Sequence, residues 1–214
     1  MPTTIYAILL AAGRSTRMGQ SKPLLPWGQS TVIESCVDHL FCGGVQEVTV
    51  VLNPQSESIM QTLASTSVGI VINDIPNCEM GVSISRGAGQ LPAAPGAILL
   101  ALADQPAVPP EVIEALISVW RKGDALVVIP TRSGRGGHPI LLDGSLKSRL
   151  LKLDPQLGLR ALLQDLEDQT VRLEVQSPYI MRDIDTLEEY EALHREVFGM
   201  TPASKPASPF QLPL

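Results

Sequence analysis

The chain has 214 residues, of which 44% are hydrophobic, 18% charged and 4% aromatic. A chain of this length removes roughly 70–75% of its unfolded surface from water, so one globular domain with a large core is expected. Sixteen basic and 22 acidic residues give a formal charge of −6, which repels polyanions and argues against a nucleic-acid partner. Apolar runs such as Ala97 to Ala103 are far shorter than the ~20 residues of a membrane-spanning helix, which argues against a membrane.

The cysteines are typical of a reducing compartment. Cys36, Cys42 and Cys78 form no C-x-x-C pair, and no histidine stands at a metal-binding spacing from them, so reduced thiols in a cytoplasmic protein are expected. The apolar stretch from Ile5 to Ala12 lacks the basic region that precedes the core of a secretory signal. We interpret it as a buried first strand.

Short apolar runs alternate with stretches of helical periodicity, the pattern of βαβ units that build an α/β, mainly parallel, doubly wound and Rossmann-like sheet. The predicted strands are Ile5–Leu10, Glu47–Leu52, Gly69–Ile72, Ala97–Ala103, Ala125–Pro130, Pro139–Leu142, Thr170–Val175 and Ile180–Asp183. The predicted helices run from Ser30 or Thr31 to Gly43, and over Gln55–Leu63, Val82–Leu91, Pro110–Lys122, Leu146–Leu153, Leu159–Leu166 and Leu187–Phe198. Residues 1–198 are expected to form one domain, and the proline-rich stretch 199–214 a mobile tail.

The segment from Leu10 to Pro23 combines small residues with cations directly after the first predicted strand. Small residues allow backbone N–H groups to approach phosphate oxygens, which basic side chains then neutralise. The candidate nucleotide-binding residues are Leu10, Ala11, Ala12, Gly13, Arg14, Arg17 and Lys22. The spacing between Gly13, Gly19 and Lys22 matches neither a Walker loop nor the Rossmann G-x-G-x-x-G. We interpret the segment as a phosphate cradle, with a solvated basic turn as the alternative.

Carboxylates at two further places could hold a cation. Asp104 ends the apolar run Ala97–Ala103, where an uncompensated carboxylate is costly, so Mg²⁺ binding or a helix cap would explain it. If the first strand neighbours this run, Gly13 and Asp104 face one crevice. Asp183 and Asp185, two residues apart, are expected on one face of a strand end and could complete the site. The alternative is that Asp185 or Thr186 caps the next helix.

Two weaker signals remain. Gly81 and Ser83 stand at the start of a predicted helix, where they could contact an anion or a base, although capping alone would also explain them. His138 lies in the glycine-rich loop Gly134–Pro139. A single histidine is more often structural or solvent-exposed than catalytic.

Together, Leu10-Ala11-Ala12-Gly13 with Arg17 and Lys22, then Leu102-Ala103-Asp104-Gln105-Pro106, Gly137-His138-Pro139 and Asp183-Ile184-Asp185-Thr186 resemble the MobA-like nucleotidyltransferases. The resemblance extends to about Val197 and implies the fold of the nucleotide-diphospho-sugar transferases. Within that superfamily the chain looks most like the CTP-dependent branch that acts on the molybdenum cofactor. Gly81-Val82-Ser83-Ile84-Ser85-Arg86 resembles a pattern of that branch, and Ala12 stands where guanylyl-transferring relatives have glycine.

The resemblance implies transfer of CMP from CTP to the terminal phosphate of molybdopterin, with release of pyrophosphate. It implies Arg17, Lys22 and Asp104 as catalytic residues, Ser83 and Asp104 in nucleotide binding, and Arg86, Gln105 and His138 in substrate binding. Mg²⁺ or Mn²⁺ would be held by Asp104 and Asp185, with Asp183 as the alternative to Asp185. A molybdoenzyme or its maturation factor would be a partner. Guanylyl transfer, sugar-phosphate nucleotidyl transfer and non-catalytic carriage of the cofactor are the alternatives.

Overall fold

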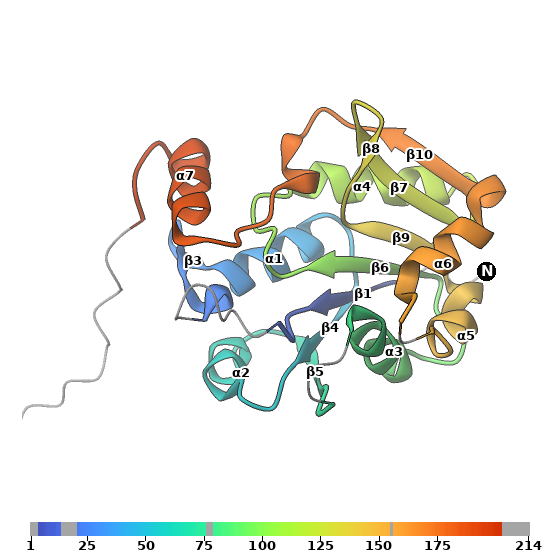
Figure 1. The fold of residues 1–214 in the computed structure, drawn as a ribbon, viewed down its shortest axis with the longest axis horizontal. Helices are drawn as coiled ribbons and strands as arrows, with labels where there is room; N and C mark the ends of the chain where they lie inside the picture. The colour runs from blue at the N-terminus through green and yellow to red at the C-terminus, as the bar shows by residue number, and fades with distance from the viewer. Residues whose placement is uncertain (1–3, 14–20, 76–78, 155, 203–214) are drawn as a thin grey trace, which may run out of the picture.

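The computed structural model describes residues 4–13, 21–75, 79–154 and 156–202. Arg14, Arg17, Cys78 and the tail beyond residue 202 therefore lie outside the described residues. A central sheet has the strand order β10-β7-β9-β6-β1-β4-β5, with β8 paired to β7 (Figure 1). These strands are β1 (Ile5–Leu10), β4 (Glu47–Leu52), β5 (Val68–Ile72), β6 (Ala97–Leu102), β7 (Val127–Arg132), β8 (Arg135–Gly136), β9 (Ile140–Asp143) and β10 (Thr170–Glu174).

The sheet is mostly parallel, as predicted. The pairs β1 with β4, β1 with β6, β4 with β5, and β7 with β10 are parallel, whereas β9 runs antiparallel to both β6 and β7. The chain moves outward from β1 through β4 to β5 and then returns to the other side of β1 as β6. The order of strands therefore reverses between β1 and β6, which is where doubly wound sheets bind their ligands.

Helices cover both faces of the sheet (Figure 1). They are α1 (Val32–Cys42), α2 (Glu57–Leu63), α3 (Met80–Gln90), α4 (Pro110–Trp120), α5 (Lys147–Leu150), α6 (Gly158–Asp165) and α7 (Leu187–Phe198). Alternate residues of β1 feed two separate cores, because successive strand side chains point to opposite faces. Leu9 packs in the core with α1, α2 and α4, whereas Ile8 packs in the core with α3, α5 and α6.

A third apolar cluster joins the start of the chain to its end. A short hairpin, β2 (Pro26–Trp27) and β3 (Ser30–Thr31), packs against α7 through Trp27, Tyr190 and Leu193. The hydroxyl of Tyr190 donates to the carbonyl oxygen of Pro26. Ile184, fully buried, belongs to the same cluster and so anchors the segment that precedes α7.

Two predicted elements need correction. Residues 180–183 do not form a strand, because Pro178–Met181 is a 3-10 helix and an irregular segment follows it. Pro178 occupies the first turn of this helix, and the Ser177 side chain accepts from the backbone N–H of Tyr179, two features that favour a helical start. The helix predicted over Leu146–Leu153 is reduced to α5, and Asp154, which precedes a proline, is biased away from helical conformation.

The ends of the other predicted helices and strands agree with the structure to within about two residues. The short strands β2, β3 and β8 were not predicted. Capping explains two of the agreements. Thr31 and Glu34 form a capping box at the start of α1, and Thr186 and Glu189 form one at the start of α7. In the described part of the chain, no helix combines the length and hydrophobicity that crossing a bilayer requires.

Candidate active site

The ends of β1 and β6 bring the first two predicted motifs together. Leu10 pairs with Leu102 in the parallel ladder, and the backbone N–H of Ala103 donates to the carbonyl oxygen of Leu10 at 3.1 Å. The condition set out from the sequence is thus met, since the strand before Gly13 and the strand before Asp104 are direct neighbours. Both turns leave the sheet at the reversal point of the strand order.

Neighbouring strands fix the first turn as far as Gly13. The N–H of Ala11 donates to the carbonyl oxygen of Val51 at 2.9 Å, and the side-chain amide of Asn53 donates to the carbonyl oxygen of Ala12 at 3.3 Å. Gly13 is exposed, and a Cβ built on it would meet no atom within 4 Å. The described chain resumes at Ser21, so the predicted roles of Arg14 and Arg17 stay predictions.

Lys22 and Asp185 form an ion pair near the turns that follow β1 and β6. The ammonium of Lys22 lies 2.7 Å from Oδ1 of Asp185, and their side chains are 13% and 45% exposed. Lys22 opens the short 3-10 helix Lys22–Leu24, whereas Asp185 immediately precedes the cap of α7. The predicted phosphate-binding lysine and a predicted metal-binding carboxylate are therefore in direct contact.

Asp183 reaches the same edge through a different partner. Nε2 of Gln105 donates to Oδ1 of Asp183 at 2.6 Å, and the backbone N–H of Ile184 donates to the carbonyl oxygen of Asp104 at 3.0 Å. Burial alternates along this segment, with Asp183 exposed, Ile184 buried and Asp185 half-buried. The prediction that the two carboxylates share one side is supported by this alternation, although no strand carries them. Thr186 caps α7, as the alternative interpretation of this motif required.

The electrostatics of Asp104 indicate a place for positive charge. Burial raises the pKa of the Asp104 carboxyl, and the nearby Asp183 and Asp185 raise it further. Lys22 and a backbone hydrogen bond lower that pKa, but the net shift is upward. An ionised Asp104 is consequently short of compensating charge, which a bound cation would supply.

His138 lies near enough to Asp183 to be influenced by its charge. Burial lowers the pKa of the imidazole, and the charge of Asp183 only partly opposes this effect. The backbone N–H of His138 donates to the carbonyl oxygen of Ile180 at 2.8 Å, and the His138–Pro139 peptide bond is cis. Gly137 must be glycine here, because a Cβ on it would lie 2.2 Å from the carbonyl oxygen of Ile180. The backbone contacts thus hold the His138 imidazole within the electrostatic range of Asp183.

Ser83 and Arg86 have partners of their own on α3. Ser83 is buried, and its hydroxyl accepts from the side-chain amide of Asn73 at 2.9 Å. Arg86 is exposed and pairs with Asp74 at 2.9 Å. No substrate role for either residue follows from these contacts, so both remain predictions.

Cys36 lies beneath the site without taking part in it. Its thiol is buried and donates to the carbonyl oxygen of Ala103 at 3.9 Å. Burial raises the pKa of the thiol, and Asp104 adds to the shift. Since the thiolate is the reactive form, Cys36 is not suited to act as a nucleophile.

The carboxylates fit a divalent cation only in part by themselves. In the described ranges, no three His, Cys, Asp or Glu side chains are grouped closely enough to hold one ion. Mg²⁺, however, is usually bound by one or two carboxylates together with substrate phosphates rather than by an all-protein cage. Asp104 with either Asp185 or Asp183 would supply the one or two carboxylates of such a shared site.

A cavity of about 710 Å³ adjoins His138 and was not predicted from the sequence. The start of α3, the length of α6 and the loop after β8 form its walls. Its lining includes Met80, Leu157, Arg160, Gln164 and Arg172. Arg172 forms an ion pair with Glu167 at 3.0 Å. The glycines at 136, 137 and 158, which line the cavity, are the sequence signal that segments of backbone lie close together here.

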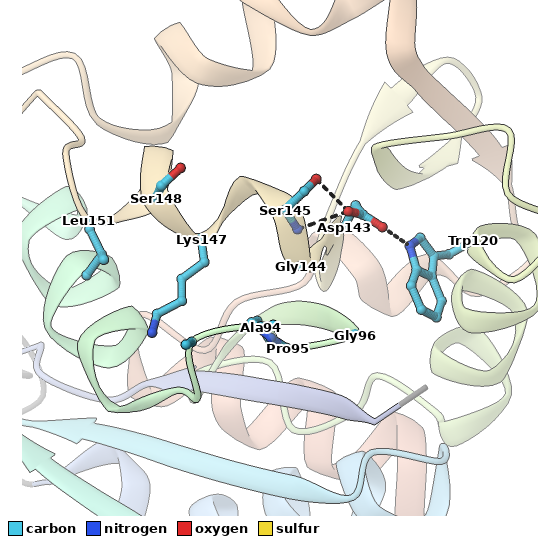
Figure 2. A pocket seen from close by; sticks show the side chains of 11 residues that line it. Ala94, Pro95, Gly96, Trp120, Asp143, Gly144, Ser145, Lys147, Ser148 and Leu151 are labelled. Carbon is cyan, nitrogen blue, oxygen red and sulfur yellow. Dashed lines mark hydrogen bonds between the residues drawn. The ribbon is translucent and has the colours of Figure 1, made fainter. Parts of the chain in front are cut away.

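A second cavity, of about 410 Å³, lies at the opposite end of the central strands, where β6 begins and β9 ends (Figure 2). Asp143 accepts there from Ser145 and from the indole N–H of Trp120 (Figure 2). Burial alone would raise the pKa of Asp143, but these hydrogen bonds lower it. Lys147 donates to the carbonyl oxygens of Leu91 and Pro92. The charged groups of this cavity are therefore used in holding the fold together.

The comparisons with known proteins agree with this architecture. The family model of the MobA-like NTP transferase domain matches residues 7–171, and the chain belongs to that family. The fold also matches the crystal structure of Rv0371c from Mycobacterium tuberculosis H37Rv, with a TM-score of 0.80, 23% identity, and coverage of 90% of this chain and 98% of that one. A nucleotidyl transferase from Methanothermobacter gives a TM-score of 0.76, 26% identity, and coverage of 90% and 97%.

Two curated relatives are equally similar to this chain in sequence but carry different names. Molybdenum cofactor cytidylyltransferase of Escherichia coli K12 is 26% identical over 190 residues, which are 88% of this chain and 94% of that protein. Nicotine blue oxidoreductase of Paenarthrobacter nicotinovorans is 26% identical over 192 residues, which are 86% and 94%. The chain is a nucleotidyltransferase of the MobA-like family, and its particular substrates have to be argued from its own residues.

Proposed function

We propose that this protein transfers CMP from CTP to the terminal phosphate of molybdopterin and releases pyrophosphate. The observation that carries the proposal is the gathering of Lys22, Asp104, Asp183 and Asp185 at the reversal point between β1 and β6, beside the turn at Gly13. The 26% identity to the E. coli cytidylyltransferase over most of both chains supports it. The reaction would take place in the cytoplasm and serve a molybdoenzyme or its maturation factor.

The chemistry asks little of the protein beyond position and charge. A phosphate monoester is largely dianionic at neutral pH, so the acceptor can attack the α-phosphorus of CTP without a side chain that removes a proton. Lys22, together with Arg14 and Arg17 in the predicted cradle, would neutralise the triphosphate. Asp104, with Asp183 or Asp185, would hold Mg²⁺ or Mn²⁺, which supplies further charge neutralisation at the phosphate oxygens.

The cavity beside His138 is the natural place for the acceptor. It adjoins the carboxylates through His138, combines apolar rim residues such as Met80 and Leu157 with Arg160, and has room for a ring system. We expect the replacement Arg160→Ala to raise the KM for molybdopterin while the KM for CTP changes less. An equal change in both would argue against this assignment.

The choice of CTP rests on Ala12. Its methyl group, where guanylyl-transferring relatives have glycine, would narrow the space for a purine, and the Asn53 contact to its carbonyl oxygen holds this turn in place. A methyl group discriminates by only ~1–3 kcal/mol, so the nucleotide must be tested directly.

The test is the release of pyrophosphate from CTP, GTP, ATP and UTP with molybdopterin and Mg²⁺. Of the four nucleotides, we expect only CTP to give efficient release of pyrophosphate. Efficient release with GTP would favour guanylyl transfer, and release with a sugar phosphate in place of molybdopterin would favour a sugar nucleotidyltransferase. Tight pterin binding without any pyrophosphate would identify a carrier. Redox turnover of nicotine blue would instead place the chain with its oxidoreductase relative.

A further inference from the structure

Gln105 is committed to the protein itself. Its side chain is 7% exposed, and its amide donates to Oδ1 of Asp183 over 2.6 Å, across 78 residues of sequence. A hydrogen bond to an ionised carboxylate is shorter and stronger than one between neutral groups. The amide of Gln105 thus has a partner within the protein, Asp183, whereas the family resemblance implies a contact with the substrate.

A second link runs alongside the first. The backbone N–H of Ile184 donates to the carbonyl oxygen of Asp104, so adjacent residues of the turn after β6 hold adjacent residues of the segment before α7. Ile184 is fully buried against the cluster of Trp27 and Tyr190. Apolar packing fixes one side of the segment, and Gln105 fixes the carboxylate on the other side.

The donor is neutral, and that distinguishes it from the partner of Asp185. Lys22 brings a positive charge to Asp185, whereas the amide of Gln105 orients Asp183 without adding charge. The two links together hold the Asp183 side chain in a fixed position next to the turn that carries Asp104. One or two such carboxylates, together with substrate phosphates, are the usual ligands of Mg²⁺.

We propose that Gln105 is a positioning residue: by holding Asp183 beside Asp104 it sets the geometry of the carboxylates that receive the cation. The inference rests on the proposed nucleotidyl transfer and deepens it. Groups that orient metal ligands from behind are worth about 10- to 100-fold in metal affinity or activity. The role differs from substrate binding because it acts through Asp183.

The experiment uses the full-length protein with Gln105→Met, which removes the donor at similar volume, and Gln61→Met on the exposed face of α2 as the matched control. Mn²⁺ binding is followed by the electron paramagnetic resonance of the free ion, with and without CTP. Pyrophosphate release gives the Mg²⁺ dependence and the KM for each substrate. We expect Gln105→Met to weaken Mn²⁺ binding and to raise the half-saturating Mg²⁺ concentration by about tenfold or more. The control should change neither.

Unchanged Mn²⁺ and Mg²⁺ dependence in Gln105→Met, with a raised KM for the acceptor, would overturn the proposal in favour of substrate contact. The Mn²⁺ titration needs no turnover, so it separates failure of this inference from failure of the proposed reaction.

A polarity exchange tests the hydrogen bond itself. Gln105→Glu sets two carboxylates against each other, and adding Asp183→Asn restores a donor and an acceptor in reversed order. We expect the double variant to recover more than half of the decrease in melting temperature that Gln105→Glu causes. A double variant no more stable than the sum of the two single changes would contradict a direct link between the two side chains.

Discussion

Lys22 and Asp185 are joined by an ion pair of 2.7 Å although 163 residues of sequence separate them. The pair links the segment after the turn at Gly13 to the segment before α7, so both ends of the domain contribute to one edge of the sheet. Because Lys22 is largely buried and Asp185 half-exposed, a nucleotide phosphate could replace the carboxylate as the partner of the ammonium.

The first prediction follows from that exchange. Lys22→Ala should raise the KM for CTP by roughly 10- to 100-fold, the size of one lost charge-assisted contact, and should affect the acceptor less. Arg17→Ala is expected to act in the same direction. Steady-state kinetics with each substrate varied in turn will measure this, and Lys122→Ala, in the exposed turn after α4, is the matched control. An unchanged KM and kcat for CTP would contradict the prediction that this segment binds the phosphates of the nucleotide.

Asp104→Ala should abolish turnover and leave the fold intact, since the replacement removes a half-buried carboxylate that is repelled by Asp183 and Asp185. Pyrophosphate release and thermal unfolding are measured on the same preparation. Retention of more than about a tenth of the activity, equal to ~1.4 kcal/mol of transition-state stabilisation, would show that Asp104 is not a principal metal ligand.

Asp104→Asn should raise the melting temperature at pH 7 in EDTA. Burial and the neighbouring carboxylates raise the pKa of folded Asp104 above its unfolded value, so the charged form destabilises the fold at pH values above the folded pKa. This penalty, and with it the gain from asparagine, should fade as the pH falls toward the unfolded value near 3.8. Melting curves from pH 4 to 8, with the exposed Asp124→Asn as control, test the sign. A gain that is the same at every pH would refute the electrostatic cause.

Gly137→Ala should destabilise the protein on the order of 1–3 kcal/mol, because its Cβ would meet the carbonyl oxygen of Ile180 at 2.2 Å. Gly89→Ala is the matched comparison, since a Cβ there meets nothing within 4 Å and alanine favours the helix by up to about 1 kcal/mol. Urea unfolding of both variants gives the two free energies. Equal effects of the two replacements would contradict the close approach at Gly137.

Ala12→Gly should raise the use of GTP relative to CTP, because it removes the methyl group that narrows the predicted base pocket. The shift is limited to ~1–3 kcal/mol, or about 5- to 150-fold in the ratio of kcat/KM. The ratio is measured for both nucleotides in wild type and variant, with Ala93→Gly, an exposed loop position, as control. A constant ratio in a folded and active variant would place base choice elsewhere.

The sequence alone was sufficient for the elements whose signals are local. Continuous apolar runs predicted β1 and β6, because strands covered by helices on both faces bury most of their side chains. The start of α1 was predicted at Ser30 or Thr31, and it could be predicted because the capping box of Thr31 and Glu34 lies within four residues of sequence. The position of Asp104 could also be predicted, since a carboxylate directly after a buried run must lie at the end of a strand.

Pairings between distant side chains could not be predicted in this way. Nothing near Asp183 or Asp185 in the sequence indicates that one carboxylate accepts from Gln105 and the other from Lys22. Residues 180–183 were predicted to form a strand, but Pro178 and the contact of Ile180 with His138 favour a 3-10 helix that ends at Met181. The large cavity beside His138 likewise arises only where α3, α6 and β7 meet.

The sequence by itself thus determined the alternation of strands and helices and the residue types at the strand ends, because backbone preference and burial depend on neighbours within one or two turns. Only the tertiary structure decided which carboxylate meets which donor. That choice depends on the order of strands around β1 and on the packing of Ile184 beneath α7, and both come from contacts between segments that lie far apart along the chain.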